Sequence, residues 1–184
     1  MANGKVRLTD TGTVAATVLS GIGAITEGTV TVNGAMTITG STEEIKNALV
    51  TETSKVIATT SANVTFVGDN PTGAELADIN DAAGGTITLA NDGQTFTGTA
   101  AVMKSAFAGG LANTQTGAVK INDTEGTIAA TVLTDITAQT SGTVTAAAAG
   151  ITITGTTTEV KAAIVTEATK AIMANGKVRL TDTG

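Results

Sequence analysis

Carboxylates are the strongest candidates for chemistry in this chain, which contains no histidine and no cysteine. The usual general bases, activated nucleophiles and zinc ligands are therefore missing. Glu43, Glu44 and Glu159 stand where a helix is expected to begin, and the helix dipole and a capping box explain acidic residues there. We therefore expect these residues to be structural, and we expect the protein to have no cofactor and no catalytic residues.

Calcium binding is a weaker possibility, because calcium takes clustered oxygen ligands and the middle of the chain is rich in acidic and amide side chains. The weak calcium candidates are Asp69, Asp78, Asp81 and Asp92, with Asn80 and Asn91 among them. No stretch matches the EF-hand loop or the nonapeptide calcium repeat. One aspartate also follows each copy of a recurring predicted strand, where capping of the next helix explains it; these are Asp10, Asp69, Asp123 and Asp182.

Three lysines recur at one position of a predicted helix: Lys46, Lys104 and Lys161. We expect a solvated stripe that offsets Glu43, Glu44 and Glu159 of neighbouring repeats. The alternative is a stripe that binds an acidic polysaccharide.

The overall composition excludes several classes of partner. The net charge is −6 and the basic residues are scattered singly, whereas nucleic-acid binding needs clustered lysine and arginine. No apolar run reaches the roughly 18–20 residues of a membrane span, and the N-terminus lacks a signal pattern. With 2% aromatic residues and no Trp or Tyr, the core must consist of Val, Ile, Leu and Ala. Such side chains suit thin, regular layers.

Internal repetition is the strongest signal in the sequence. Gly-Thr-(Val/Ile)-Thr occurs at residues 28–31, 85–88 and 142–145, and Thr-Gly followed by Ser or Thr occurs at 39–41, 97–99 and 154–156. Leu19 and Ile22 recur as Leu76 and Ile79 and as Leu133 and Ile136. The chain is therefore predicted to contain three diverged units, at residues 1–60, 61–116 and 117–176. Residues 177–184 are the first strand of a fourth.

Each unit is predicted to run strand, helix, strand, strand, helix. Residues 5–10 alternate as a half-buried strand, and residues 11–22 form a short amphipathic helix that Asp, Thr and Gly cap at its start. Gly21 and Gly23 are expected to end this helix. Residues 28–40 are predicted as two strands around a tight turn at Asn33-Gly34. A second helix begins with the capping box Ser41–Glu44, which recurs as Thr156–Glu159. In the second unit, Asn70 and Pro71 are expected to begin the corresponding first helix in the same way, with Pro71 in its first turn.

These units favour an α/β solenoid, in which each unit covers the apolar face of its neighbour. Equivalent strands then pair as parallel sheets along the stack, where Thr and Val suit the ladders. The alternative is a tandem array of ferredoxin-like βαββα modules. It needs a further strand, for which residues 54–60 are a candidate in the first unit only.

The same twelve residues, Met-Ala-Asn-Gly-Lys-Val-Arg-Leu-Thr-Asp-Thr-Gly, open and close the chain at 1–12 and 173–184. One strand would thus be presented at opposite ends of a stack that lacks atypical polar caps, and open strand edges invite further pairing. We expect either a longer covalent array or head-to-tail joining of copies, which gives a filament when it does not close. A deliberate duplication is the third explanation. The expected self-association residues are Lys5, Val6, Arg7, Leu8, Lys177, Val178, Arg179 and Leu180.

The pattern at residues 8–19, 28–31 and 37–49, with copies at 121–133, 142–145 and 152–164, resembles repeats of giant cell-surface or secreted bacterial proteins of the marine cyanobacterial type. The second unit departs from this pattern at its start. The resemblance implies an extracellular or cell-surface location, a filament, matrix or adhesin role, and no catalytic residue. The function expected is therefore structural, and the alternative is an adhesin-type module that binds glycan or another cell surface.

Overall fold

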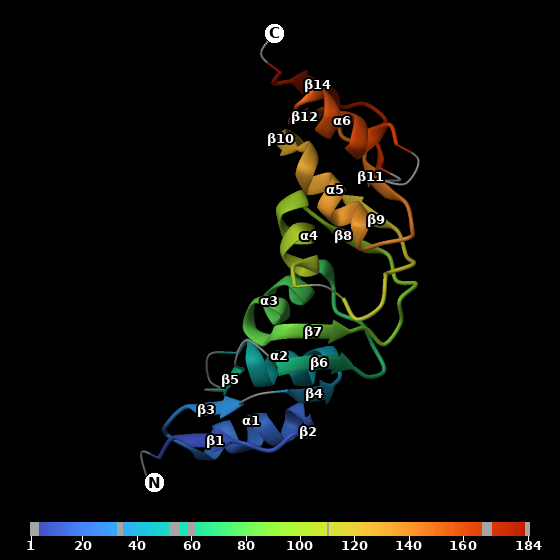
Figure 1. Ribbon diagram of the computed structural model, residues 1–184. Coiled ribbons are helices and arrows are strands. Elements are labelled where there is room, and N and C mark those ends of the chain that lie inside the picture. Colours follow the sequence, from blue (N-terminus) through green and yellow to red (C-terminus); the bar gives the residue numbers. More distant parts are fainter. Residues whose placement is uncertain are drawn as a thin grey trace. The chain divides into compact units, whose positions relative to one another are not determined.

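The computed structural model describes residues 4–32, 35–51, 56–58, 62–109, 111–166 and 171–182, which form a mixed α/β protein with parallel sheets and six helices (Figure 1). The predicted turn at Asn33-Gly34 lies outside the described residues. Residues 1–3 and 183–184 of the duplicated sequence, and residues 54, 55, 59 and 60 of the candidate strand, also lie outside them. The chain divides into two compact units. The first comprises residues 1–71, 75–91 and 108–113, and the second comprises residues 72–74, 92–107 and 114–184. The predicted repeat boundaries stay a prediction.

The first unit contains two parallel sheets. One sheet has the order β1 (Val6–Leu8), β3 (Val30–Val32) and β5 (Val56–Ala58). The other has the order β2 (Gly12–Ala15), β4 (Met36–Gly40), β6 (Ala62–Phe66) and β7 (Gly84–Thr88). Helices α1 (Ala16–Ile25) and α2 (Thr42–Leu49) pack side by side, and α3 (Gly73–Ala83) follows β6 in the chain.

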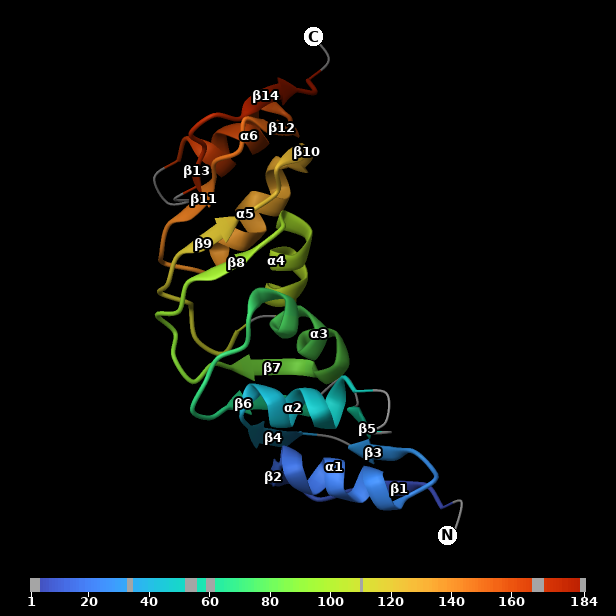
Figure 2. The same ribbon diagram turned by 180° about the vertical axis from the view of Figure 1, so that it is seen from behind.

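The second unit repeats this organisation. Its sheets have the orders β8 (Phe96–Gly98), β9 (Val119–Ile121), β11 (Val144–Ala146), β13 (Ala171–Ile172), and β10 (Glu125–Ala129), β12 (Gly150–Gly155), β14 (Lys177–Leu180). Figure 2 shows β9 beside β8 and β11. Helices α4 (Ala100–Phe107), α5 (Ala130–Ala138) and α6 (Thr157–Ile164) pack in chain order, α4 on α5 and α5 on α6.

The two strands predicted around Asn33-Gly34 form, but not as a pair. β3 joins the sheet of β1 and β5, whereas β4 pairs with β2 and β6. Each strand instead pairs in parallel with a strand of the next turn of chain, which buries the β-branched residues of both sheets at once. The ferredoxin-like alternative is therefore wrong, because all pairs between the described strands are parallel.

The helix predicted over residues 11–22 is shifted. Residues 12–15 form β2, and α1 begins at Ala16 without a side-chain cap, so the predicted Asp-Thr-Gly cap is wrong. The helix continues to Ile25, which places Gly21 and Gly23 inside it rather than at its end. Glycine costs about 1 kcal/mol in a helix, and packing of a buried face outweighs that preference. Helix α3 similarly begins at Gly73, so Pro71 precedes the helix rather than standing in its first turn.

The second helix of each predicted unit is as expected. Ser41 Oγ accepts a hydrogen bond from Glu44 N at 3.3 Å while Glu44 Oε2 accepts one from Ser41 N at 2.8 Å. Thr156 and Glu159 form the same reciprocal pair. The predicted inner faces are buried except for Ile164, which is half-buried; they comprise Ile45, Ala48, Leu49, Met103, Ala106, Phe107, Val160 and Ala163. The spacing of the apolar residues therefore predicts which face of each helix is buried.

The glycine of each Gly-Thr-(Val/Ile)-Thr landmark lies against the backbone of an earlier segment. A Cβ on Gly28, Gly85 or Gly142 would lie 2.6, 2.3 or 2.2 Å from the carbonyl oxygen of Gly4, Ala62 or Gly117, respectively. Two threonines reinforce this approach. Thr140 Oγ1 donates to Gly117 O at 2.7 Å and accepts from Gly142 N at 2.9 Å, and Thr26 does the same between Gly4 and Gly28. These contacts hold the backbones of successive segments in direct contact with each other.

Candidate functional site

The strand predicted to open each unit can pair along both of its edges. β9 pairs with β8 on one edge and β11 on the other, and β6 pairs with β4 and β7. The end copies use one edge each in the described structure: β1 pairs with β3, and β14 pairs with β12. The structure therefore places residues 6–8 and 177–180 of the predicted self-association set in strands at the edge of a sheet, with Lys5 directly before β1 (Figure 1).

The backbone amides show that β1 and β14 use opposite edges of the same strand. Val119 N in β9 donates to Thr143 O, on the side of β11, at 2.9 Å. Asn122 N, which follows β9, donates to Gly98 O, on the side of β8, at 3.0 Å. Val6 N donates to Thr29 O at 3.0 Å, which matches the first of these bonds. Thr181 N donates to Gly155 O at 2.9 Å, which matches the second. Because successive amides of a strand point to opposite edges, the free edges are complementary.

The aspartate after this strand caps an earlier helix, not the following one. Asp123 accepts a hydrogen bond from Ala100 N at the start of α4 at 2.7 Å. Asp69 accepts one from Thr42 N of α2 at 3.0 Å, and Asp182 accepts one from Thr157 N of α6 at 2.6 Å. The expectation that these residues cap the next helix is therefore wrong. Asp10, the fourth of the series, is exposed. The recurrence of aspartate at this position was the signal for the contact, but its partner depends on strand pairing.

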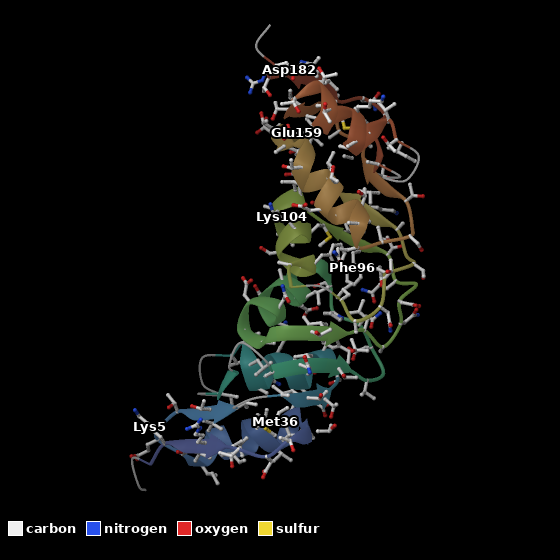
Figure 3. The ribbon with its side chains drawn as sticks, viewed as in Figure 1. Lys5, Met36, Phe96, Lys104, Glu159 and Asp182 are labelled. Atoms are coloured by element: carbon white, nitrogen blue, oxygen red, sulfur yellow. The ribbon has the colours of Figure 1, made fainter. Side chains whose placement is uncertain are left out.

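Asp182 and Glu159 lie at the same end of α6 (Figure 3). The hydroxyl of Thr157 donates to Asp182 at 2.5 Å, and this bond, with that from the backbone amide, lowers the pKa of Asp182 below its ordinary value of 3.8. The ionised carboxylate is also favoured by the helix dipole. This acidic group thus joins the segment after β14 to the start of α6.

We expect the cap at Asp182 to be lost at low pH. Because the folded-state pKa is lowered, the stabilisation is complete above the ordinary pKa and is lost as the pH falls through the lowered value. Hydrogen exchange at Thr157 N, followed by NMR from pH 6 to pH 2, should therefore quicken relative to the intrinsic rate below about pH 4. An Asp182→Asn variant should lack this pH dependence. An identical acid response in the variant would show that another group is responsible.

The lysine stripe pairs with acidic residues of the following helix. Lys46 lies 2.7 Å from Glu75 on α3, which raises the pKa of Lys46, and Lys104 lies 3.4 Å from Asp135 on α5. The sequence predicted that the stripe offsets Glu43, Glu44 and Glu159. The ion pairs of Lys46 and Lys104 are made with other residues, although the charge of Glu43 also contributes to the raised pKa of Lys46. Glu44 and Glu159 are occupied by their capping boxes. Lys161 is exposed on α6.

An open polar groove of about 540 Å³ lies beside Lys46 in the first unit. Its lining carries hydroxyl, carboxylate, amide and ammonium groups from Thr42, Glu43, Lys46, Asn47, Thr51, Asp69, Asn70 and Glu75. Among the described residues, the buried Thr42 Oγ1 has no hydrogen-bond partner. A groove of this character offers donors and acceptors suited to a hydroxylated ligand.

The calcium candidates are not brought together as a ligand set. Asp69 caps α2, and Asp78 and Asp81 are exposed on α3. Asp92 belongs to the second unit, where its carbonyl oxygen accepts from Thr116 N at 2.6 Å. Within the described ranges, no group of three or more acidic side chains is placed to hold a metal ion.

None of the described helices is long and apolar enough to cross a membrane. Comparisons of the chain with protein-family models, with curated proteins and with solved structures give no match.

Proposed function

We propose that this chain is a structural repeat protein, an α/β solenoid whose units continue from one copy to the next. It would form or belong to an extracellular bacterial filament, matrix or giant surface protein, and it has no catalytic task. The resemblance of the repeats to those of giant bacterial surface proteins supports the extracellular location. The scarcity of catalytic residue types supports a structural role.

The observation that carries this proposal is the double pairing of β9. This strand lies between β8 and β11 within one parallel sheet, and its side chains Val119 and Ile121 are buried. β1 and β14, which have the same sequence, each make one of these two pairings. β1 pairs with β3 as β9 pairs with β11, and β14 pairs with β12 as β9 pairs with β8. A second copy added at either end can therefore pair with an open strand edge in the register that β9 already uses within the chain.

The assembly should be visible by negative-stain electron microscopy at rising protein concentration, with an intact mass measured beside it. Filaments from a chain of 18.0 kDa would support end-to-end joining of separate copies. Filaments from a much larger chain would support a covalent array. Single particles at all concentrations, from a chain of this mass, would contradict both.

A second candidate function is an adhesin-type module that binds glycan or another cell surface, and the polar groove beside Lys46 favours it. A glycan array probed with the intact protein tests this function. Binding that an Asn47→Ala variant loses, while its circular dichroism is unchanged, would support the groove as the site. An absence of hits would contradict the glycan reading.

A further inference from the structure

We propose that residues 177–182 are an exchangeable occupant of the edge formed by β12 and α6, and that residues 5–10 of a second copy replace them. This inference rests on the proposed end-to-end assembly and specifies its joint. A single strand then ends the sheet of the first copy and begins the sheet of the second. The displaced strand, residues 177–182, has the same sequence as the strand that replaces it.

The receptor for this strand is defined by contacts that β14 already makes. Residues 152–155 of β12 pair in parallel with residues 177–180. Gly155 O accepts from Thr181 N at 2.9 Å, and Asp182 accepts from Thr157 N and Thr157 Oγ1 at 2.6 and 2.5 Å. Every residue from 177 to 182 has an identical counterpart in 5–10, so the second copy supplies the same donors, acceptors and carboxylate; these counterparts are Lys5, Val6, Arg7, Leu8, Thr9 and Asp10.

The donor strand can make these contacts without leaving its own sheet. Val6 N is engaged with Thr29 O, and this pairing uses the edge of β1 that faces β3. Thr9 N lies three residues further on, at the position of Asn122 N, and both Thr9 and Asp10 are exposed. β9 is the internal precedent, because it pairs on both edges while Asp123 caps α4.

Burial favours the shared strand over two half-paired strands. Val119 and Ile121 of β9 are 0% and 5% exposed, whereas Val178 and Leu180 of β14 are 47% and 53% exposed. The helices show the same difference. Ala-Thr-Val-Leu occurs at 16–19 and 130–133, and Val132 lines a hollow with Ala100, Ala101 and Lys104 of α4, whereas Val18 is 52% exposed. A preceding copy would partly cover Val18 with its α6, as α4 partly covers the half-buried Val132.

Two matched proline variants of the full chain test the exchange. Thr181→Pro removes the amide that holds the resident segment to Gly155 O, and it leaves the donor strand intact. We expect it to speed assembly about tenfold, the factor that corresponds to one such hydrogen bond. Thr9→Pro removes the equivalent amide of the donor, which its own sheet does not use, and we expect it to abolish assembly. Asp10→Ala, an exposed side-chain change, is a second donor variant that should slow assembly without altering the fold.

Assembly is measured by sedimentation velocity and electron microscopy, with circular dichroism as the control for folding. Faster assembly by Thr181→Pro together with loss of assembly by Thr9→Pro and slowing by Asp10→Ala supports the exchange. Assembly of both donor variants at the rate of the unmodified chain overturns the exchange and leaves end-to-end joining in place. Failure of Thr181→Pro to assemble while the unmodified chain does so overturns the exchange alone, and failure of the unmodified chain to assemble overturns the filament as well.

A peptide competitor gives an independent readout. The synthetic peptide Gly-Lys-Val-Arg-Leu-Thr-Asp-Thr-Gly, which corresponds to residues 4–12, should occupy the open edge of the Thr181→Pro variant and inhibit its assembly. The same peptide with Ala in place of Asp10 should inhibit less, because it cannot cap α6. Inhibition that depends on the aspartate supports the exchange, and equal or absent inhibition by the two peptides overturns it.

Discussion

Replacing Phe96 by alanine is expected to lower the free energy of unfolding of the second unit by about 3–5 kcal/mol. Phe96 is 1% exposed, and its ring meets the edge of Phe107 at a centroid distance of 5.6 Å and an interplanar angle of 89°. The chain has three Phe and neither Trp nor Tyr, and most of its other core side chains are aliphatic and offer little volume to refill the cavity. A loss of this size is a large part of the stability of an ordinary domain.

Urea unfolding followed by far-ultraviolet circular dichroism measures this loss, because the chain lacks tryptophan fluorescence. Phe96→Leu is the matched control and should cost less, since it conserves most of the buried volume. Val67→Ala, at a side chain 59% exposed, should change the free energy of unfolding by less than about 0.5 kcal/mol. A cost for Phe96→Ala no larger than that of Val67→Ala would contradict the assignment of Phe96 to the core.

Alanine at Gly142 is expected to cost about 1–3 kcal/mol or more, because its Cβ would lie 2.2 Å from Gly117 O and 2.5 Å from Gly117 C. The backbone at Gly117 cannot move aside freely, since Thr140 Oγ1 donates to its carbonyl oxygen at 2.7 Å. Thermal or urea unfolding of the Gly142→Ala chain measures the cost.

The control is the same substitution with the opposite expected sign. Gly21 lies on an exposed position inside α1, where a Cβ would meet nothing within 4 Å. Gly21→Ala should therefore raise the free energy of unfolding by about 0.5–1 kcal/mol. Gly28→Ala, in the same unit as Gly21, should resemble Gly142→Ala, because its Cβ would lie 2.6 Å from Gly4 O. A uniform response of the three glycines would show that close backbone approach does not govern them.

Features that depend on a few neighbouring residues could be predicted from the sequence. The Ser41–Glu44 and Thr156–Glu159 capping boxes form because the hydroxyl and carboxylate lie three residues apart on one helical turn. The buried faces of α2, α4 and α6 follow from the same periodicity. Mixed α/β structure with parallel pairing was also expected from the recurrence of short β-branched strands.

Features that depend on pairing between distant segments could not be predicted in the same way. The Asn33-Gly34 dipeptide favours a hairpin, yet β3 and β4 gain more by pairing in separate parallel sheets. Residues 12–15 have helical spacing of their apolar side chains, but β4 offers them a strand partner and they form β2. The caps made by Asp69, Asp123 and Asp182 depend on the same registers, since each aspartate is carried to an earlier helix by a paired strand.

The residues predicted to self-associate lie in or beside strands at sheet edges, and their self-association stays a prediction. The identity of residues 5–8 and 177–180 was visible in the sequence, whereas the opposite direction of their free amides required the register of β1 on β3 and of β14 on β12. Lys46 and Lys104 were expected to offset Glu43, Glu44 and Glu159, but their partners came from the following helix. Side-chain partners across packed helices depend on packing and not on repeat spacing.

The short reach of the strand pairing also governs how the chain can fold. Val6 pairs with Val30, Val144 pairs with Ala171, and Asp182 caps a helix start 25 residues before it. Parallel sheets usually require contacts between remote segments and fold slowly, whereas here each new turn needs only the turn before it as a template. Folding can therefore advance from the N-terminus, one pair of neighbouring segments at a time, while later residues are still being synthesised.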